Sequence, residues 1–183
     1  MATECEPRDT TESCDANATE SINSLRVLIK KGKVEVAPHF GSASKSWDNL
    51  IAPYQALLAA TEGVGQFASD ILISSDTQTE CQAALEEAWG CVRSFLVSLS
   101  HQLPESRHGM LPLITTAQCR MDFFLKDVPC LKAFGLDCLG RLATYRAEIE
   151  TDPETRNRWM TASERWYNEA KREATSTLSL DGQ

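Results

Sequence analysis

From Trp47 onward, apolar residues recur at spacings of three and four, the pattern of α-helices with one buried face. The first stripe consists of Leu50, Tyr54, Leu57, Leu58, Val64, Phe67 and Ile71. The second is the most regular and consists of Cys81, Ala84, Ala88, Val92, Phe95 and Leu99, with Leu85, Trp89, Leu96 and Leu103 beside it. The third consists of Met110, Ile114, Ala117, Met121 and Phe124. These stripes predict three consecutive helices.

Two further helices are predicted after Pro129. The first has two apolar faces, one with Leu131, Phe134, Cys138, Leu142, Tyr145 and Ile149, and a smaller one with Leu139, Ala143 and Ala147. A helix with two apolar faces is expected between two neighbours. The second begins at Asp152-Pro153 and carries Trp159, Ala162, Trp166 and Ala170, with Met160 and Tyr167 beside them. The expected core includes Trp89, Phe95, Leu142, Tyr145, Trp159, Trp166, Tyr167 and Ala170.

The two ends of the chain lack this pattern. Residues 1–46 are predicted to be a flexible acidic region, with residues 1–21 disordered and residues 41–46 a linker. Within it, Leu25–Phe40 has short β-branched runs around Lys31-Gly32, which fit either a hairpin or a short helix. Residues 175–183 are predicted to be a flexible tail. Residues 47–174 are expected to be an all-α domain of antiparallel helices, either a bundle or a solenoid of helix pairs.

The net charge of −8 narrows the choice of partner. Proteins that bind nucleic acid usually carry a basic surplus, because phosphate contacts need Lys and Arg. The N-terminus has no cationic start followed by an apolar run, so no signal peptide is predicted. No apolar stretch approaches the ~20 residues that a membrane-spanning helix needs. We therefore expect a nuclear or cytoplasmic protein with no membrane partner, and nucleic acid only through a local basic patch.

The seven cysteines give no sign of a metal site. None forms a C-x-x-C pair, and no histidine stands at zinc-ligand spacing from them. Five of them fall inside apolar helical patterns, where they are expected to be reduced, buried structural thiols: Cys81, Cys91, Cys119, Cys130 and Cys138. No metal and no cofactor are expected.

Some short patterns imitate catalytic motifs. Gly63-x-Gly65-x-x-Ala68 has the spacing of a dinucleotide fingerprint, but a helical pattern precedes it where a strand is needed, so a helix break is expected there. Ser42-x-x-Lys45 lacks the companion motifs of serine acyl-enzymes. No Ser–Asp constellation accompanies the histidines, which are His39, His101 and His108. An enzyme with a small-molecule substrate is not expected.

Three segments resemble one protein family: AWGCVRSFLVSLSHQLPESRHGML (residues 88–111), CLGRLATYR (residues 138–146) and RNRWMTASERWYNEA (residues 156–170). They are similar to the telomerase-activating "ever shorter telomeres" family and its SMG-type relatives in nonsense-mediated decay, especially to fungal proteins with that DNA/RNA-binding-type domain. The resemblance covers about residues 86–174. It implies a tetratricopeptide-like α-solenoid fragment, and in the decay factors an adjoining 14-3-3-like arrangement binds phosphoserine peptides.

The chain departs from the family's C-L-G-D-L-x-R-Y-R signature at two positions. Arg141 replaces the Asp, and Thr144 replaces the first Arg, to which the resemblance assigns phosphate binding; the second Arg is kept as Arg146. The expectation is that a phosphoserine peptide binds weakly or not at all, and that Thr144→Arg improves binding. The family also continues into a further helix, whereas this chain stops at Gly182-Gln183, so we expect that it either lacks that helix and the rest of the solenoid or is truncated.

The arginines near the C-terminus have two interpretations. Acidic residues are interspersed with them, so they can form a solvated, salt-bridged surface worth ~0.3–0.5 kcal/mol per pair. Alternatively, Arg141, Arg146 and Lys171 form a site for a partner or a phosphate, with Arg141 having no near acid.

The leading hypothesis is a non-catalytic helical scaffold that binds a protein partner, as the resemblance implies. The second is a protein that binds telomeric DNA or RNA, and the third is a truncated remnant without activity. A steep fall of affinity with salt would identify the second.

Overall fold

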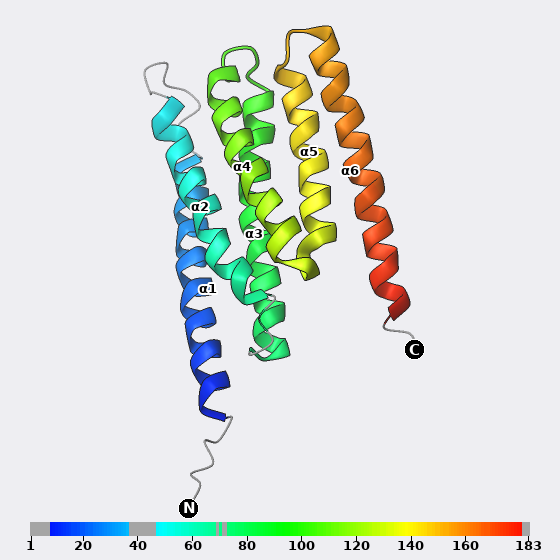
Figure 1. The fold of residues 1–183 in the computed structure, drawn as a ribbon. Helices are drawn as coiled ribbons and strands as arrows, with labels where there is room; N and C mark the ends of the chain where they lie inside the picture. The colour runs from blue at the N-terminus through cyan, green and yellow to red at the C-terminus, as the bar shows by residue number, and fades with distance from the viewer. Residues whose placement is uncertain (1–7, 37–46, 69, 71–72, 181–183) are drawn as a thin grey trace, which may run out of the picture.

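The computed structural model describes residues 8–36, 47–68, 70 and 73–180, and within these ranges it contains helices and no strand (Figure 1). The helices are α1 (Arg8–Val36), α2 (Trp47–Ala68), α3 (Ser75–Ser100), α4 (Arg107–Asp127), α5 (Lys132–Ile149) and α6 (Pro153–Leu180). A short 3-10 helix, Pro129–Leu131, joins α4 to α5. The prediction of an all-α protein is confirmed.

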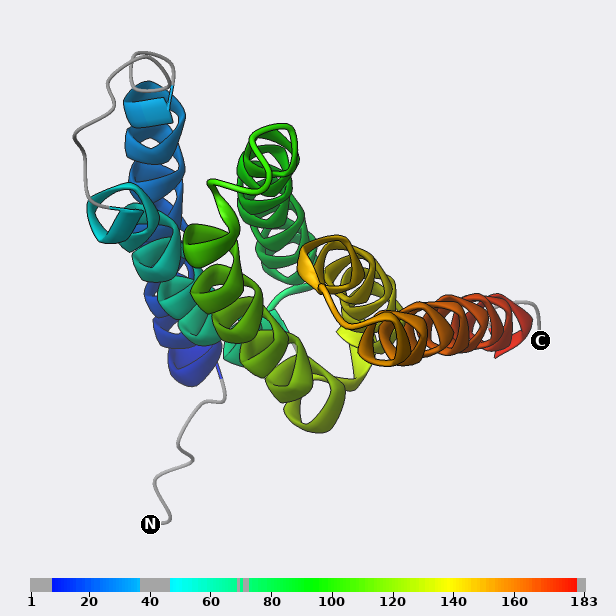
Figure 2. The same ribbon diagram turned by 90° about the horizontal axis from the view of Figure 1, so that it is seen from above.

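The helices form a bundle with a hairpin added to one side (Figure 2). Helix α1 packs against α2 and α3, and α2 packs against α3 and α4. Helix α5 lies between α4 and α6, which confirms the prediction from its two apolar faces. Helix α6 packs mainly against α5, so it is the edge helix of the structure.

The position of α6 explains which predicted core residues are buried. Four of the eight are buried, namely Trp89, Phe95, Leu142 and Ala170. The other four, Tyr145, Trp159, Trp166 and Tyr167, are only half-buried, although Tyr145 and Trp166 still pack against the core. Three of these four lie on α6, where the aromatic stripe has a helix on one side only. The edge position leaves part of each ring in contact with solvent.

The N-terminal region is helical where the sequence predicted flexibility. Helix α1 buries Ala18, Ile22, Leu25 and Ile29, which recur at helical spacing and face α2 and α3. Asp15 also accepts a hydrogen bond from the backbone N–H of Ser74 (2.9 Å), which links α1 to the start of α3. The sequence analysis did not predict this helix because its apolar stripe has only about one residue per turn among polar residues. The prediction of a hairpin is therefore wrong for the residues up to Val36. Residues 37–40 and the predicted linker, residues 41–46, lie outside the described residues.

Two other boundaries differ from the prediction. Helix α6 ends at Leu180, so most of the segment predicted as a tail is helical; residues 181–183 lie outside the described part of the chain. Helix α2 continues through Gly63 and Gly65 to Ala68 without the predicted break, and Ile71 is outside the described residues. The reason for a glycine at position 65 is packing. The ring of Phe124 on α4 lies where its Cβ would be.

This packing predicts opposite results for two glycines of α2. A Cβ at position 65 would come within 2.5 Å of Cε1 of Phe124, whereas a Cβ at position 63 meets nothing within 4 Å. Both Gly63→Ala and Gly65→Ala gain helix propensity, up to about 1 kcal/mol. Only Gly65→Ala also overpacks the core, at a cost of about 1–3 kcal/mol. Urea denaturation should therefore give Gly63→Ala a free energy of unfolding about 1–3 kcal/mol higher than that of Gly65→Ala. Equal free energies of unfolding would contradict the packing of Phe124 on α2.

Candidate partner-binding surfaces on the hairpin of α5 and α6

Close contact between α5 and α6 brings the two segments of the family resemblance together. The ring of Tyr167 packs on Gly140, where an added Cβ would come 2.8 Å from the ring. Ser163 donates a hydrogen bond to the carbonyl of Gly140 (2.8 Å), and its hydroxyl lies 3.0 Å from that of Thr144. Thr144 is thus engaged between the helices. An arginine there would have to displace Ser163, which argues against a phosphate contact from position 144.

Arg141 and Arg146 leave α5 on different sides. Five residues correspond to about 140° around a helix axis. The Nε of Arg141 donates to Oδ2 of Asp137 (2.9 Å), an acidic neighbour one turn earlier that the sequence analysis overlooked. Arg146 instead pairs with Glu150 (3.8 Å), and its guanidinium carbon lies 5.7 Å from the ring centroid of Trp159. The two arginines therefore do not form one site.

Lys171 lies on the same side of the hairpin as Arg141. It is exposed and follows Tyr167 by four residues, so the two side chains leave α6 in similar directions. Burial raises the pKa of Tyr167, and the nearby charge of Arg141 opposes the rise, which places Arg141 close to this tyrosine. Of the three predicted site residues, the structure places Arg141 and Lys171 on one side and Arg146 on the other.

A hollow of about 580 Å³ opens on the Tyr167 side, near the turn between α5 and α6. Its lining comes from α5, α6 and the end of α3 with the turn that follows, and consists of Ser100, Leu103, Ala147, Glu148, Arg156 and Met160. Met160 is 42% exposed, so much of its apolar side chain is open to a molecule that enters the hollow. Sequence reasoning placed Met160 beside the aromatic stripe of this helix and assigned no binding role to it. The available signal was that Met160 falls beside that stripe and not within it.

Charges of both signs border the hollow. Burial raises the pKa of the Glu148 carboxyl, and the nearby His101 opposes the rise. Arg156 donates from Nε (3.2 Å) and Nη2 (2.8 Å) to the backbone carbonyl of Glu150, the residue that caps the C-terminus of α5. This anchoring fixes the position of the Arg156 guanidinium at the edge of the hollow.

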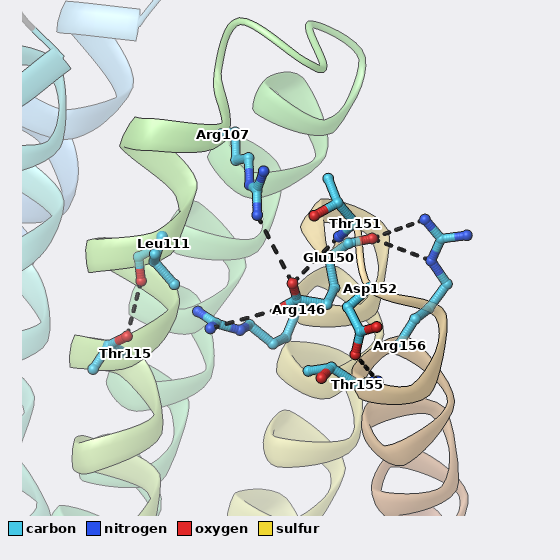
Figure 3. A network of polar contacts seen from close by, with 9 residues as sticks. All are labelled: Arg107, Leu111, Thr115, Arg146, Glu150, Thr151, Asp152, Thr155 and Arg156. Carbon is cyan, nitrogen blue, oxygen red and sulfur yellow. Dashed lines mark hydrogen bonds and ion pairs between the residues drawn. The ribbon is translucent and has the colours of Figure 1, made fainter.

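On the α4 side, two arginines meet one carboxylate (Figure 3). Arg107, in the first turn of α4, lies 3.8 Å from Oε1 of Glu150, and Arg146 lies 3.8 Å from Oε2. The Glu150 side chain is 14% exposed, and that of Arg146 is 23% exposed. The Nε of Arg146 is buried with no hydrogen-bond partner among the described residues. We call Arg107, Arg146 and Glu150 the Glu150 cluster; its three members were not connected by the sequence analysis.

The described cysteines are free thiols, as predicted, but not all of them are buried. Burial raises the pKa of Cys81 to about 11 and raises that of Cys138 still further, so both stay protonated and unreactive near neutral pH. Cys119 and Cys130 are exposed and Cys91 is only half-buried, which corrects the prediction that these three are buried. The described residues contain no group of three His, Cys, Asp or Glu that could hold a metal ion. No helix in the described ranges is both long and apolar enough to cross a membrane.

Comparisons with protein-family models, with curated proteins and with solved structures find no match to this chain. The class that fold and surface define is an all-helical protein whose terminal hairpin carries a hollow on one side and the Glu150 cluster on the other. These two surfaces present the side chains that a partner or ligand of the hairpin would meet.

Proposed function

We propose that this protein is a non-catalytic helical scaffold that binds a segment of a protein partner in the hollow between α3, α5 and α6. The observation that carries the proposal is the exposed Met160 beside a hollow whose other apolar walls are Leu103 and Ala147. A flexible thioether side chain adapts its shape to different apolar groups. The hollow therefore suits an apolar side chain of a partner.

The charges around the hollow favour a polypeptide over a nucleic acid. Arg156 can pair with a carboxylate or a carbonyl of the bound segment, and Glu148 can accept from a backbone N–H or a cation. A phosphate backbone would meet the carboxylate of Glu148 as well as the net charge of −8. Arg141 and Lys171 extend the same side of the hairpin and can contact the segment beyond the hollow.

The order of the helices supports a finer form of this proposal. Helices α5 and α6 are a consecutive, closely packed pair joined by a short turn, and α5 lies between α4 and α6. In a tetratricopeptide-like solenoid such pairs stack and expose an extended binding surface. We include in the proposal that the chain is such a fragment, related to the telomerase-activating and decay factors that its sequence resembles.

The proposal predicts that Met160→Asp weakens partner binding at least tenfold. A charge in place of the apolar wall would have to be desolvated by any apolar side chain that enters. Peptides selected from a displayed library on the wild-type protein would supply the ligand, and calorimetry would give the affinities; a tenfold loss is about 1.4 kcal/mol. Thr161→Asp is the matched control, because Thr161 is the next residue and is exposed outside the lining of the hollow.

Two results would contradict the proposal. One is a selected peptide that loses affinity equally in both variants, which would indicate a general charge effect. The other is a preference for an oligonucleotide whose affinity falls steeply as salt rises, which would favour the nucleic-acid alternative.

A further inference from the structure

The two arginines of the Glu150 cluster have donors without close acceptors. A guanidinium group carries five N–H donors, and a hydrogen bond to oxygen requires about 2.7–3.2 Å. Both arginine–carboxylate distances are 3.8 Å, so Glu150 offsets one of the two positive charges without accepting a hydrogen bond of normal length from either arginine. The buried Nε of Arg146 has no partner in the described part of the chain. An unpaired buried donor is costly, so this position is short of an acceptor.

The charge of the surroundings also favours an anion. Arg107 and Arg146 both face the Glu150 carboxylate, which gives two positive charges against one negative charge. The two nearest carboxylates on the following turn have their own partners. Asp152 accepts from the backbone N–H of Thr155 (2.8 Å), and Glu154 pairs with Arg158 (3.6 Å). Glu154 is thus paired with a cation, whereas Asp152 keeps its negative charge, so the excess is the single positive charge of Arg107, Arg146 and Glu150 taken together.

The positions of the two guanidinium groups are set by different elements. Arg107 comes from the first turn of α4, whereas Arg146 comes from the last turn of α5 and lies over the ring of Trp159 on α6. An aromatic face holds a guanidinium through cation–π attraction while leaving its N–H edge available. The donors therefore converge from two helices toward one point.

We propose that Arg107 and Arg146 bind a tetrahedral oxyanion, either free phosphate or a phosphate monoester, and that Glu150 occupies the same donors until this anion displaces it. An oxyanion of this kind has a charge of about −1.5 to −2 at pH 7 and three strong acceptor oxygens, so it satisfies more donors than a carboxylate can. Guanidinium groups match it through paired hydrogen bonds. The inference goes beyond the proposed function, because the site lies on the α4 side of the hairpin and its ligand is not an apolar segment.

The first test is to titrate the protein with inorganic phosphate and, separately, with phenyl phosphate at pH 7.5. Phosphorus NMR and calorimetry measure the binding. Arg107→Gln and Arg146→Gln should each lower the affinity at least tenfold. Arg158→Gln should leave the affinity unchanged, since Arg158 is a surface arginine of α6 that pairs with Glu154 of the same helix. Dimethyl phosphate should bind at least tenfold more weakly than phenyl phosphate, because a diester has one charge and fewer free oxygens.

The second test uses the internal competitor. Glu150→Gln keeps the size of the side chain and the backbone carbonyl that Arg156 uses, but removes the competing charge. It should raise the phosphate affinity about tenfold, with an unchanged helical circular dichroism spectrum. The proposal is overturned if phosphate binding is absent, if it is insensitive to both arginines, or if Glu150→Gln lowers it. Tighter binding of phenyl phosphate than of inorganic phosphate would identify a monoester as the ligand, and the reverse order would identify free phosphate.

Discussion

Phe95→Ala is expected to lower the free energy of unfolding by about 3–5 kcal/mol. The Phe95 ring is 2% exposed and stacks on Tyr54 of α2 with a centroid distance of 4.0 Å. Truncation removes this contact and leaves a cavity between α2 and α3 that the rigid helices can fill only in part. Urea denaturation followed by far-ultraviolet circular dichroism would measure the change.

Val97→Ala provides the comparison on the same helix. Val97 is 40% exposed, so its truncation should change stability by no more than about 0.5 kcal/mol. Similar losses in both variants would show that α3 does not present Phe95 to the core. Trp166→Ala would also truncate an aromatic side chain, one that the sequence analysis placed in the core. Because Trp166 is half-buried on the edge helix, we now expect a smaller loss than for Phe95→Ala.

Leu25→Ala is expected to cost about 2–5 kcal/mol, the second large effect. Leu25 is fully buried in the middle of α1, which packs against both α2 and α3. The same denaturation experiment measures the loss. It also tests directly whether the N-terminal segment is part of the folded core, which the sequence analysis did not predict.

Val27→Ala is the control for this prediction. Val27 follows Leu25 by two residues on α1 and is 53% exposed, so its truncation should be nearly neutral. If Leu25→Ala were equally neutral, α1 would not support the core. The flexible N-terminal region expected from the sequence would then be the correct description.

The contrast between α3 and α1 shows what the sequence could predict about the fold. The apolar stripe of α3 has several large residues per two turns, so the recurrence of apolar residues at helical spacing is easy to recognise in the sequence. The stripe of α1 includes Ala18, Ile22, Leu25 and Ile29 in a segment rich in Thr, Ser, Asp and Glu, and polar residues on both sides conceal the period. Packing against α2 and α3 makes this narrow stripe sufficient to hold α1 in the core. The sequence of α1 alone does not indicate these two contacts.

The candidate surfaces were less predictable than the helices. The spacing of Arg141 and Arg146 on one helix already excludes a shared site, and the i,i+4 pairing of Arg141 with Asp137 was available from the sequence. Other contacts depend on how distant helices pack. Arg107 and Glu150 are far apart in the chain and meet only because α4 and α5 are neighbours, and the hollow needs residues from three helices.

The edge position of α6 also bears on how the chain assembles during synthesis. The principal helix contacts join helices one or two positions apart in the chain, and loop closure between such neighbours loses little entropy. The four helices of the bundle pack mainly on one another, while α6 packs mainly on α5. Domains are made from the N-terminus and fold as units as they emerge. The bundle can therefore form on the ribosome before the hairpin is complete, and α5 and α6 then add to a surface that already exists.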